Sequence, residues 1–359
     1  MAWWHPDHFM RKVPYLQERA RIFGEIRAFF DARGYLEVDT PALQTAPCME
    51  AHIQAFKTEL LSADRQSKRA MYLHTSPEFA MKKLLVAGLP KIYQLAKVFR
   101  NAEGSSWHSP EFTMLEWYQR GMDYKDMMEE TADLVRHVLK KPVVAEGRSC
   151  DPRQPWEKIT VVEALRKYAD IDIIDHLPRH PEQSEGSSPG KIPRSARNDK
   201  LEAPLEYLRA EAKRIGVYVS PHDDWENALL KILMEKVETR LGSPAPAIIY
   251  DYPVSMAALS RPKPEDPRFA ERFEVYVCGI ELANAFGELT DAKVQRERFL
   301  ADVALRKKVY GDDYPVDEDF LRALEFGLPA CSGNALGVDR LVMLATGADN
   351  IALVQAAPV

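Results

Sequence analysis

The sequence contains few cysteines and lacks any segment apolar enough to suggest a membrane span. Its four cysteines lie far apart, without the paired spacing of a zinc site or a disulfide framework, and we interpret them as buried apolar residues: Cys48, Cys150, Cys278 and Cys331. No run of about 18 apolar residues occurs, and the N-terminal MAWWHPDHFMRK lacks the pattern of a secretory signal. These absences favour a cytoplasmic protein that does not interact with membranes.

Two common phosphate-binding motifs are also missing. Neither GxxxxGK nor a GxGxxG between a strand and a helix is present, so any nucleotide must bind in another way. The net charge of −6 gives no overall basic field, which argues against nucleic acid as the main partner. What the chain does have is 46% hydrophobic residues over 359 positions, enough for one large domain or two.

Helical and strand patterns divide the chain into three sections. Residues 1–146 and 246–359 combine amphipathic helical segments with strand-like segments, whereas residues 147–245 show helical patterns without a strong strand. We therefore expect residues 147–245 to form a small, mainly helical insertion. Within it, residues 178–200 are dense in Pro, Ser, Gly and charge, which predicts a disordered or solvated loop.

A long hairpin places an arginine and two carboxylates in an aromatic segment. The strand-like IYQLAKVFR ends at Arg100, and a connection rich in Gly, Ser, His and Pro leads to the strand-like FTMLEWY. Side chains alternate along a strand, so four residues of the return strand share one face: Phe112, Met114, Glu116 and Tyr118. A connection of this length is usually functional or disordered, which suggests that this face binds a ligand.

The segment GIELANAFGELTD carries two further acids, Glu281 and Glu288. Their odd separation would put them on opposite faces of a regular strand, so we expect a bulge or bend at Ala285–Gly287 to bring them together. One interpretation is a pair of oxygen ligands for Mg²⁺, and the alternative is one exposed and one structural acid. Glu78, in TSPEFAMKKLL, falls in the first turn of a predicted helix, where a carboxylate is stabilising even without a ligand.

Near the end of the chain, GNALGVDRLVM passes from a strand into an apolar helix. Gly333 and Gly337 would let the backbone approach a flat ligand, and Arg340 could stack on a base and reach a phosphate. The alternative is that both glycines serve packing alone, which is common where a strand meets a helix.

Together these segments resemble the catalytic core of the class II aminoacyl-tRNA synthetases, in particular that of lysyl-tRNA synthetase. The helix ending in GYLEVDTPAL, the hairpin FRN…HSPEFTMLEWY and GNALGVDRLVM resemble its three signature segments, and TSPE and GIELANAFGELTD resemble its lysine-binding and metal-binding segments. In that enzyme an anticodon-binding domain precedes the first signature helix, which here starts near residue 16, so we expect no anticodon reader. In length and in RFEVYVCGIELAN and CSGNALGVDRLVML, the sequence is similar to the elongation factor P lysine ligases, a truncated family of this class.

The resemblance implies an α+β core with a mainly antiparallel sheet flanked by helices, and an ATP-dependent ligase that uses Mg²⁺. It implies that (R)-β-lysine or lysine is activated as an adenylate and transferred to a lysine of elongation factor P, with no tRNA involved. Arg100 and Arg340 would be the catalytic residues. The ATP-binding residues would be Arg100, Asn101, Ala102, Glu103, His108, Ser109, Phe112, Glu281, Leu282, Gly337 and Arg340. The amino-acid site would comprise Ser76, Pro77, Glu78, Glu116, Tyr118, Asn284 and Glu288, and the metal ligands would be Glu281 and Glu288.

Three positions depart from the pattern that the resemblance supplies. Ala102 stands where the hairpin usually has Glu, so the adenine contact would come from Glu103 or from backbone. Ser109 stands where Asn is more frequent. Ala335 stands where lysyl-tRNA synthetases have Gly, which would narrow the amino-acid site and disfavour plain α-lysine.

Two other functions remain open, and an oligomeric state is expected. The alternatives are a free-standing synthetase that charges tRNA and a catalytically silent regulatory paralogue. We also expect a homodimer, because the first helix, with Phe23, Phe29 and Phe30, carries more aromatic surface than an edge helix needs, and this segment forms the subunit contact in class II cores.

Overall fold

The computed structural model describes residues 3–178 and 194–358. Its contacts separate two compact units. The first unit comprises residues 1–147 and 287–359, and the second comprises residues 148–286. The second unit is therefore inserted into the chain of the first.

A four-stranded sheet forms the centre of the first unit. Its strands, in spatial order, are β1 (Leu36–Glu37), β5 (Lys91–Phe99), β6 (Glu111–Arg120) and β13 (Cys331–Gly337). The β1–β5 pair is parallel, whereas β5–β6 and β6–β13 are antiparallel. The predicted hairpin is thus confirmed as β5 and β6. A smaller sheet consists of β2 (Leu43–Gln44), β4 (Lys68–Leu73) and β3 (Lys57–Leu61).

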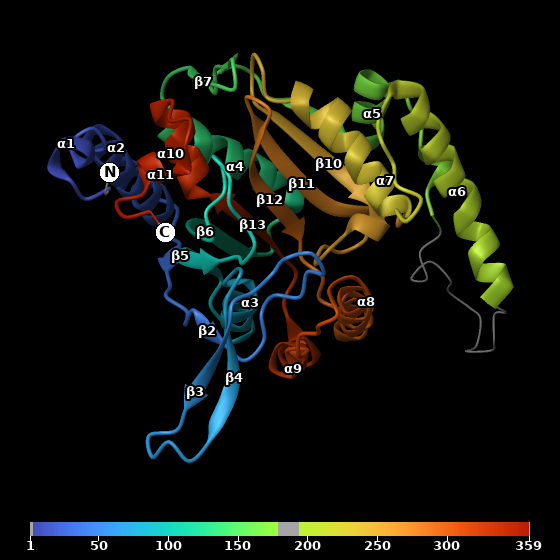
Figure 1. The fold of residues 1–359 in the computed structure, drawn as a ribbon, viewed down its shortest axis with the longest axis horizontal. Coiled ribbons are helices and arrows are strands. Elements are labelled where there is room, and N and C mark those ends of the chain that lie inside the picture. The colour runs from blue at the N-terminus through green and yellow to red at the C-terminus, as the bar shows by residue number, and fades with distance from the viewer. Residues whose placement is uncertain (1–2, 179–193, 359) are drawn as a thin grey trace. The chain divides into compact units, whose positions relative to one another are not determined.

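Helices precede, connect and follow the strands of the first unit. They are α1 (Pro6–Phe9), α2 (Val13–Asp31), α3 (Glu78–Val86), α4 (Tyr124–Val138), α8 (Ala292–Tyr310), α9 (Glu318–Gly327), α10 (Val338–Thr346) and α11 (Ile351–Val354). In Figure 1, α2 near the N-terminus lies beside α10 and α11 near the C-terminus, and all three are in contact. A short strand, β7 (Val143–Ala145), follows α4. Both ends of the chain therefore contribute to the same unit.

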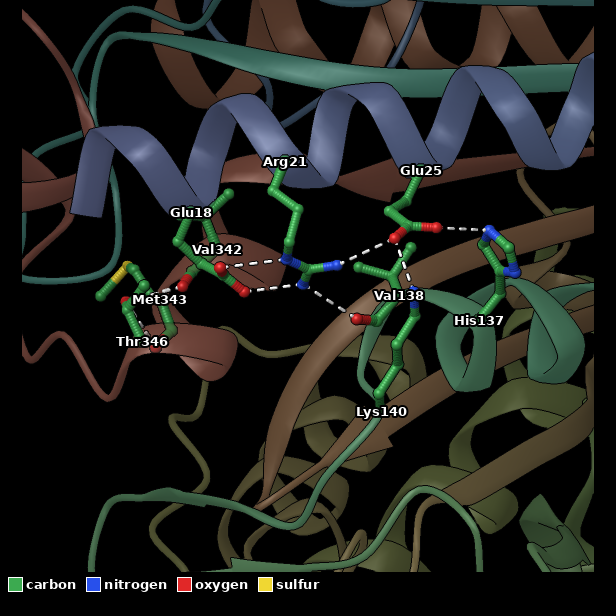
Figure 2. A network of polar contacts seen from close by, with 9 residues as sticks. All are labelled: Glu18, Arg21, Glu25, His137, Val138, Lys140, Val342, Met343 and Thr346. Atoms are coloured by element: carbon green, nitrogen blue, oxygen red, sulfur yellow. Dashed lines mark hydrogen bonds and ion pairs between the residues drawn. The ribbon is translucent and has the colours of Figure 1, made fainter. Parts of the chain in front are cut away.

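Helix α2 joins α4 through a polar network as well as through its apolar side. Arg21 donates to the Glu18 carboxylate at 2.6 Å and to the carbonyl oxygen of Val138 at 3.1 Å. Glu25 accepts from Lys140 at 2.6 Å and pairs with His137 at 2.9 Å, as Figure 2 shows. These contacts fix the end of α4 against α2.

The aromatic side chains of α2 are part of the interior of the first unit. Phe29 and Phe30 are 2% and 0% exposed, and Phe30 stacks on Tyr93 with 4.6 Å between ring centroids. Phe29 and Phe30 therefore belong to the interior of this unit, and the expected homodimer stays a prediction. Gly34, shortly after the end of α2, has φ +74°, a conformation that favours glycine.

The second unit packs helices against strands of its own. Its strands are β8 (Arg148–Cys150), β9 (Glu157–Thr160), β10 (Ala247–Pro253), β11 (Phe269–Val277) and β12 (Ile280–Gly287). β12, β11 and β10 pair antiparallel, and β9 pairs parallel to β10. The helices are α5 (Val161–Ala169), α6 (Arg194–Ile215) and α7 (Trp225–Ile232). The helices expected at 147–245 thus lie in one unit with β10, β11 and most of β12.

The core of the second unit explains how its helices are held. A Thr160–Glu163 capping box begins α5, and buried apolar residues of α5, α6, α7 and β10 form one cluster. The loop predicted at 178–200 lies mostly outside the described residues, although α6 already begins at Arg194.

The predicted fold class is confirmed. Both units combine helices with a mainly antiparallel arrangement of strands, and each has one parallel pair. The four cysteines are buried and unoxidised, as expected. Within the part of the chain that the structure describes, we find no helix that could span a bilayer.

Candidate active site

The return strand of the hairpin presents the side chains that the sequence places on one face. β6 is regular from Glu111 to Arg120, which confirms that Phe112, Glu116 and Tyr118 share a side. On the neighbouring strand β13, small residues stand opposite: Gly333 against Tyr118, Ala335 against Glu116 and Gly337 against Met114. Because directly opposed residues of an antiparallel pair point to the same face, this side of the sheet is lined by small residues next to large polar ones.

An arginine and an aromatic ring lie at one end of this face. The guanidinium carbon of Arg100 is 5.3 Å from the centre of the Phe112 ring. The Nε of Arg100 is buried and has no hydrogen-bond partner among the described residues. Phe112 packs on Ala96, Val98 and Met114, which form a small apolar cluster. A flat ring and a phosphate would both find suitable partners here.

The second predicted catalytic arginine contacts the hairpin loop. Arg340, in the first turn of α10, donates from Nη2 to Nε2 of His108 at 2.7 Å. Nδ1 of His108 lies 2.8 Å from Oγ of Ser105. Since Nε2 accepts, we assign the imidazole proton to Nδ1, which donates to Ser105. Burial and the charge of Arg340 lower the pKa of His108, which keeps the ring neutral at physiological pH.

The rest of the hairpin loop is held by its backbone. Asn101 donates its N–H to the carbonyl oxygen of Gln54 at 2.7 Å, and its side chain accepts from the N–H of Ala102 at 2.8 Å. Ala102 has φ +59°, a left-handed conformation that is unusual for a residue other than Gly or Asn. Glu103 is half-buried and lies near enough to influence His108, while Ser109 is buried. The predicted nucleotide residues of the first unit are therefore brought together around one hairpin.

At the other end of the face, Glu116 lies in a buried polar cluster. Ser76 donates to Oε1 of Glu116 at 2.5 Å, and Tyr118 donates to Oε2 at 2.9 Å. Ser76 also accepts from the N–H of Glu78 at 3.0 Å, so it caps α3, for which Pro77 occupies the position before the first helical residue. Burial and the nearby charge of Glu78 raise the pKa of Glu116 to about 8.

Lys82 is a functional candidate that the sequence analysis missed. Its ammonium pairs with Oε1 of Glu78 at 2.5 Å and with Oε2 of Glu288. Both Lys82 and Glu288 are 1% exposed. Burial acts to lower the pKa of Lys82, but the charges of Glu288 and Glu78 outweigh it and raise the pKa. The spacing of Glu78 and Lys82, four residues apart on a helix, was the signal available in the sequence.

Gly333 makes room for this cluster. A Cβ at this position would overlap the Tyr118 ring and the Glu288 carboxylate. Glu288 also donates its N–H to the carbonyl oxygen of Cys331 at 3.0 Å. The glycine therefore serves close approach of side chains, whereas a Cβ at Gly337 would make only an ordinary contact with Arg340, 3.6 Å away.

The remaining predicted residues, Glu281, Leu282 and Asn284, belong to β12 in the second unit. The register of β12 shifts at Leu282, so the bulge expected at Ala285–Gly287 is wrongly placed. Asn284 stands opposite Glu274 of β11 and donates to its carboxylate at 3.3 Å. Glu274 was missed by the sequence analysis.

Glu274 and Glu281 belong to an acidic group inside the second unit. Glu274 also accepts from Arg272 at 2.7 Å and from Tyr276 at 2.8 Å. Burial, together with the charges of Glu274 and Glu281, raises the pKa of Glu238 to about 8. In the segment RFEVY, the charged residues Arg272 and Glu274 alternate with the apolar residues Phe273 and Val275. This alternation was the signal for the group.

The predicted metal ligands fit Mg²⁺ unequally. Glu281 is partly exposed, and a carboxylate in such a position suits an ion that takes one or two protein carboxylates and completes its shell with phosphate and water. Glu288 already pairs with Lys82, which favours its role as an amino-acid ligand. Among the described residues, no three His, Cys, Asp or Glu side chains are placed to hold a metal ion by themselves.

Comparison with known proteins agrees with this arrangement. Residues 10–359 match the family of class II tRNA synthetases (D, K and N). The sheet, the hairpin and the helix bearing Arg340 therefore form a class II synthetase catalytic domain. The chain is 39% identical to the elongation factor P–(R)-beta-lysine ligase of Vibrio vulnificus (strain YJ016), over 99% of this chain and 98% of the relative. It is 40% identical to the ligase of the same name from Avibacterium paragallinarum, over 97% and 95% of the two chains.

A third relative of that name, from Proteus mirabilis (strain HI4320), is 39% identical over 100% of this chain and 98% of its own length. The chain belongs to the family of elongation factor P–(R)-beta-lysine ligases. The family resemblance noted in the sequence is thereby confirmed.

Proposed function

We propose that this protein uses ATP to activate (R)-β-lysine or lysine as an adenylate and transfers the acyl group to a lysine side chain of elongation factor P. The names of the relatives support the ligase activity and the protein acceptor. The observation that carries the proposal is the buried cluster of Glu78, Glu116 and Glu288. Glu78 and Glu288 share one internal ammonium, and Glu116 can lose its proton when a cation binds beside it, so the cluster suits a substrate with two ammonium groups.

The amino-acid residues have separate roles in this proposal. Glu78 binds the amine nearest the reacting carboxylate, and Glu288 binds the other ammonium. Glu116 and Tyr118 line the same site, and Ser76 orients Glu116. The role that the resemblance gives to Asn284, in the second unit, stays a prediction.

The nucleotide residues act through position and charge. Phe112 and Arg340 hold adenine between a ring and a guanidinium. Arg100, whose guanidinium carbon lies 5.3 Å from the centre of the Phe112 ring, contacts the α-phosphate. The loop from Asn101 to Ser109 covers the nucleotide, and Gly337 allows close approach. Glu281, with Glu288 as its predicted second ligand, would hold Mg²⁺, which neutralises phosphate charge when bound. The role of Leu282 stays a prediction.

Two steps follow, and neither needs an enzyme nucleophile. The substrate carboxylate attacks the α-phosphorus of ATP in line, which forms the acyl-adenylate and releases pyrophosphate. The ε-amine of the acceptor lysine then attacks the activated carbonyl, which forms an amide, releases AMP and loses a proton. Arg100 stabilises the charge that develops on the α-phosphate, and the surrounding side chains orient the reactants.

Two alternative functions are less well supported than the proposed ligase activity. A tRNA-charging enzyme is less well supported, because a net charge of −6 provides little of the counterion-release affinity on which nucleic-acid binding depends. A silent paralogue is less well supported because Arg100, Glu281, Glu288 and Arg340 are all present. We propose a cytoplasmic homodimer, and light scattering at micromolar concentration tests the oligomeric state.

The first test is ATP–pyrophosphate exchange with α-lysine and β-lysine compared side by side. Arg100→Ala should reduce exchange by about 10² to 10³, because a preorganised charge contact is lost. Arg120→Ala, at the exposed end of the hairpin's other strand, β6, is the control and should retain the wild-type rate.

The second test identifies the acceptor. Enzyme, ATP, Mg²⁺ and radiolabelled amino acid are incubated with purified elongation factor P and, separately, with total tRNA. Label should appear on the protein. A comparable or faster rate on tRNA would replace the proposal with the tRNA-charging alternative.

A further inference from the structure

Lys82 places a cation between two of the carboxylates that the proposed function assigns to substrate ammonium groups. Its ammonium pairs with Glu78, one helical turn earlier on α3, and with Glu288, which follows β12. The side chain of Lys82 is 1% exposed, so water does not compete for these contacts. The protein thus holds a primary ammonium of its own inside a cluster expected to bind primary ammonium groups.

The neighbouring lysine shows that this placement is specific. Lys83 points away from the cluster and pairs with Asp317 at 3.5 Å and Asp319 at 3.1 Å. Its side chain is 27% exposed and that of Asp319 is 62% exposed, so this second pair is a surface ion pair, which contributes little to stability. Two adjacent lysines on one helix therefore have different surroundings.

Stability alone does not account for Lys82. A buried ion pair loses hydration on both sides, and replacing such a pair with apolar residues is often neutral or stabilising. The cluster also contains more acid than base, since Glu116 lies near Glu78 and both share contacts with Ser76. An arrangement that is incompletely neutralised suits a site that receives a further cation.

The position of Lys82 also determines the direction of both carboxylates. Oε1 of Glu78 and Oε2 of Glu288 face the ammonium, so the other oxygen of each group is left to point elsewhere in the cluster. Without the ammonium, two buried carboxylates would repel each other and turn apart. Lys82 thereby holds two acids, which come from distant parts of the sequence, in one arrangement.

We propose that Lys82 is a positioning residue for the amino-acid substrate, which aligns Glu78 and Glu288 and cancels one of their charges so that the cluster selects a diamino acid. This inference rests on the proposed function, because it assumes that the cluster binds the substrate. Lys82 does not contact the reacting atoms. It acts through the two carboxylates.

The test compares Lys82→Met, which keeps the length of the side chain and removes its charge, with Lys82→Arg, which keeps the charge. KM and kcat are measured for β-lysine and for ATP by pyrophosphate exchange. In Lys82→Met, KM for β-lysine should rise by about tenfold or more, because two buried acids lose their partner. KM for ATP should rise clearly less, because only one of the two acids, Glu288, is also a predicted Mg²⁺ ligand. Lys82→Arg should recover most of the loss.

Selectivity provides a readout that a merely structural role would not change. The ratio of kcat/KM for lysine to that for norleucine, which lacks the side-chain ammonium, should fall by about tenfold in Lys82→Met, because Glu288 is no longer aligned. Lys83→Met is the matched control and should change neither KM nor selectivity. Thermal unfolding of each variant shows whether the substitution changes stability. Isothermal calorimetry measures lysine binding in the absence of ATP.

The outcomes separate the two proposals. If the wild-type protein shows no amino-acid-dependent exchange, the proposed function is wrong. If the wild-type protein is active and Lys82→Met keeps its KM and selectivity, or loses affinity for ATP and amino acid equally, the inference about Lys82 is wrong. If Lys82→Met does not fold, Lys82→Gln takes its place. A higher KM for β-lysine and a lower selectivity in Lys82→Gln, largely recovered in Lys82→Arg, support the inference. A wild-type KM and selectivity in Lys82→Gln contradict it.

Discussion

Thr113 donates its backbone N–H to the carboxylate of Asp339 at 2.6 Å, which joins β6 to α10 across 226 residues of sequence. Arg19 completes this contact by donating to Asp339 and to the Thr113 hydroxyl, both at 2.8 Å. Asp339 is 1% exposed. Because Asp339 immediately precedes Arg340, and Thr113 immediately follows Phe112, the bond fixes the two proposed adenine-binding side chains relative to each other.

Asp339→Asn should therefore weaken both stability and nucleotide binding. The substitution removes the charge that Arg19 and the Thr113 amide share, at a cost of about 1 to 3 kcal/mol. Urea unfolding should show a lower midpoint, and KM for ATP should rise more than KM for β-lysine. Asp349→Asn, at an exposed position shortly after the same helix, is the control and should match the wild type. An unchanged midpoint in Asp339→Asn would contradict the structural role.

Glu116 should make stability depend on pH. Its pKa in the folded chain is about 8, above the ordinary 4.5, so the folded state keeps a proton that the unfolded state releases. The resulting stabilisation is present below about pH 4.5 and is lost as the pH rises towards about 8. In Glu116→Gln this contribution should be absent. Unfolding free energies measured between pH 5 and pH 9, about the range of the titration, test this by their slope.

Binding of the amino acid should release a proton from Glu116. An ammonium placed next to the carboxylate favours its charged form and lowers its pKa. Calorimetry of lysine binding at neutral pH, in buffers with different heats of ionisation, should show proton release that Glu116→Gln abolishes. Equal heats in all buffers for the wild-type protein would show that Glu116 does not change its protonation on binding.

Gly333→Ala should damage the amino-acid site. The added methyl group would overlap the Tyr118 ring and the Glu288 carboxylate, and neither is free to move in a buried cluster. We expect a loss of about 1 to 3 kcal/mol in stability and a higher KM for β-lysine. Gly24→Ala is the control, because that glycine lies in α2 with nothing within 4 Å of an added Cβ, and it should be neutral or stabilising.

His108 should titrate below the ordinary histidine pKa of 6.5. Burial and Arg340 favour the neutral ring, so the contact with Arg340 is present above pH 6.5 and is lost as the pH falls through the lowered pKa. An NMR titration of the imidazole measures this value directly. Arg340→Gln should raise it towards the ordinary value, and a His108 pKa above 6.5 in the wild-type protein would disprove the assigned tautomer and contact.

Patterns among neighbouring residues were sufficient to predict which side chains share one face of the hairpin and where the strand with Gly333 and Gly337 lies. Alternation along β6 places Phe112, Glu116 and Tyr118 on one side, because a strand without a bulge has a period of two. The apolar helix that follows the strand bearing Gly333 and Gly337 was also predicted, and it is α10. These features depend on neighbours in sequence.

Features that depend on distant residues were missed. The bulge at Leu282 depends on how β11 pairs with β12, and the sequence of β12 contains no glycine or proline there to mark it. The burial of Phe29 and Phe30 within the same chain could not be read from the sequence, because the amphipathic pattern of a helix does not show whether its apolar side meets the same chain or another. Lys82 was missed because its second partner, Glu288, lies 206 positions away.

The interruption of the first unit by residues 148–286 also has a consequence for biosynthesis. Glu78, Lys82 and Glu116 leave the ribosome before the inserted unit, whereas Glu288 and β13 follow it. At roughly 5 to 20 residues per second, the nascent chain waits roughly ten to thirty seconds between Glu116 and Glu288, with one edge of β6 unpaired and Lys82 lacking its second carboxylate. Substitutions that delay folding of the inserted unit should therefore lower the yield of soluble enzyme, even when they lie far from every ligand-binding side chain.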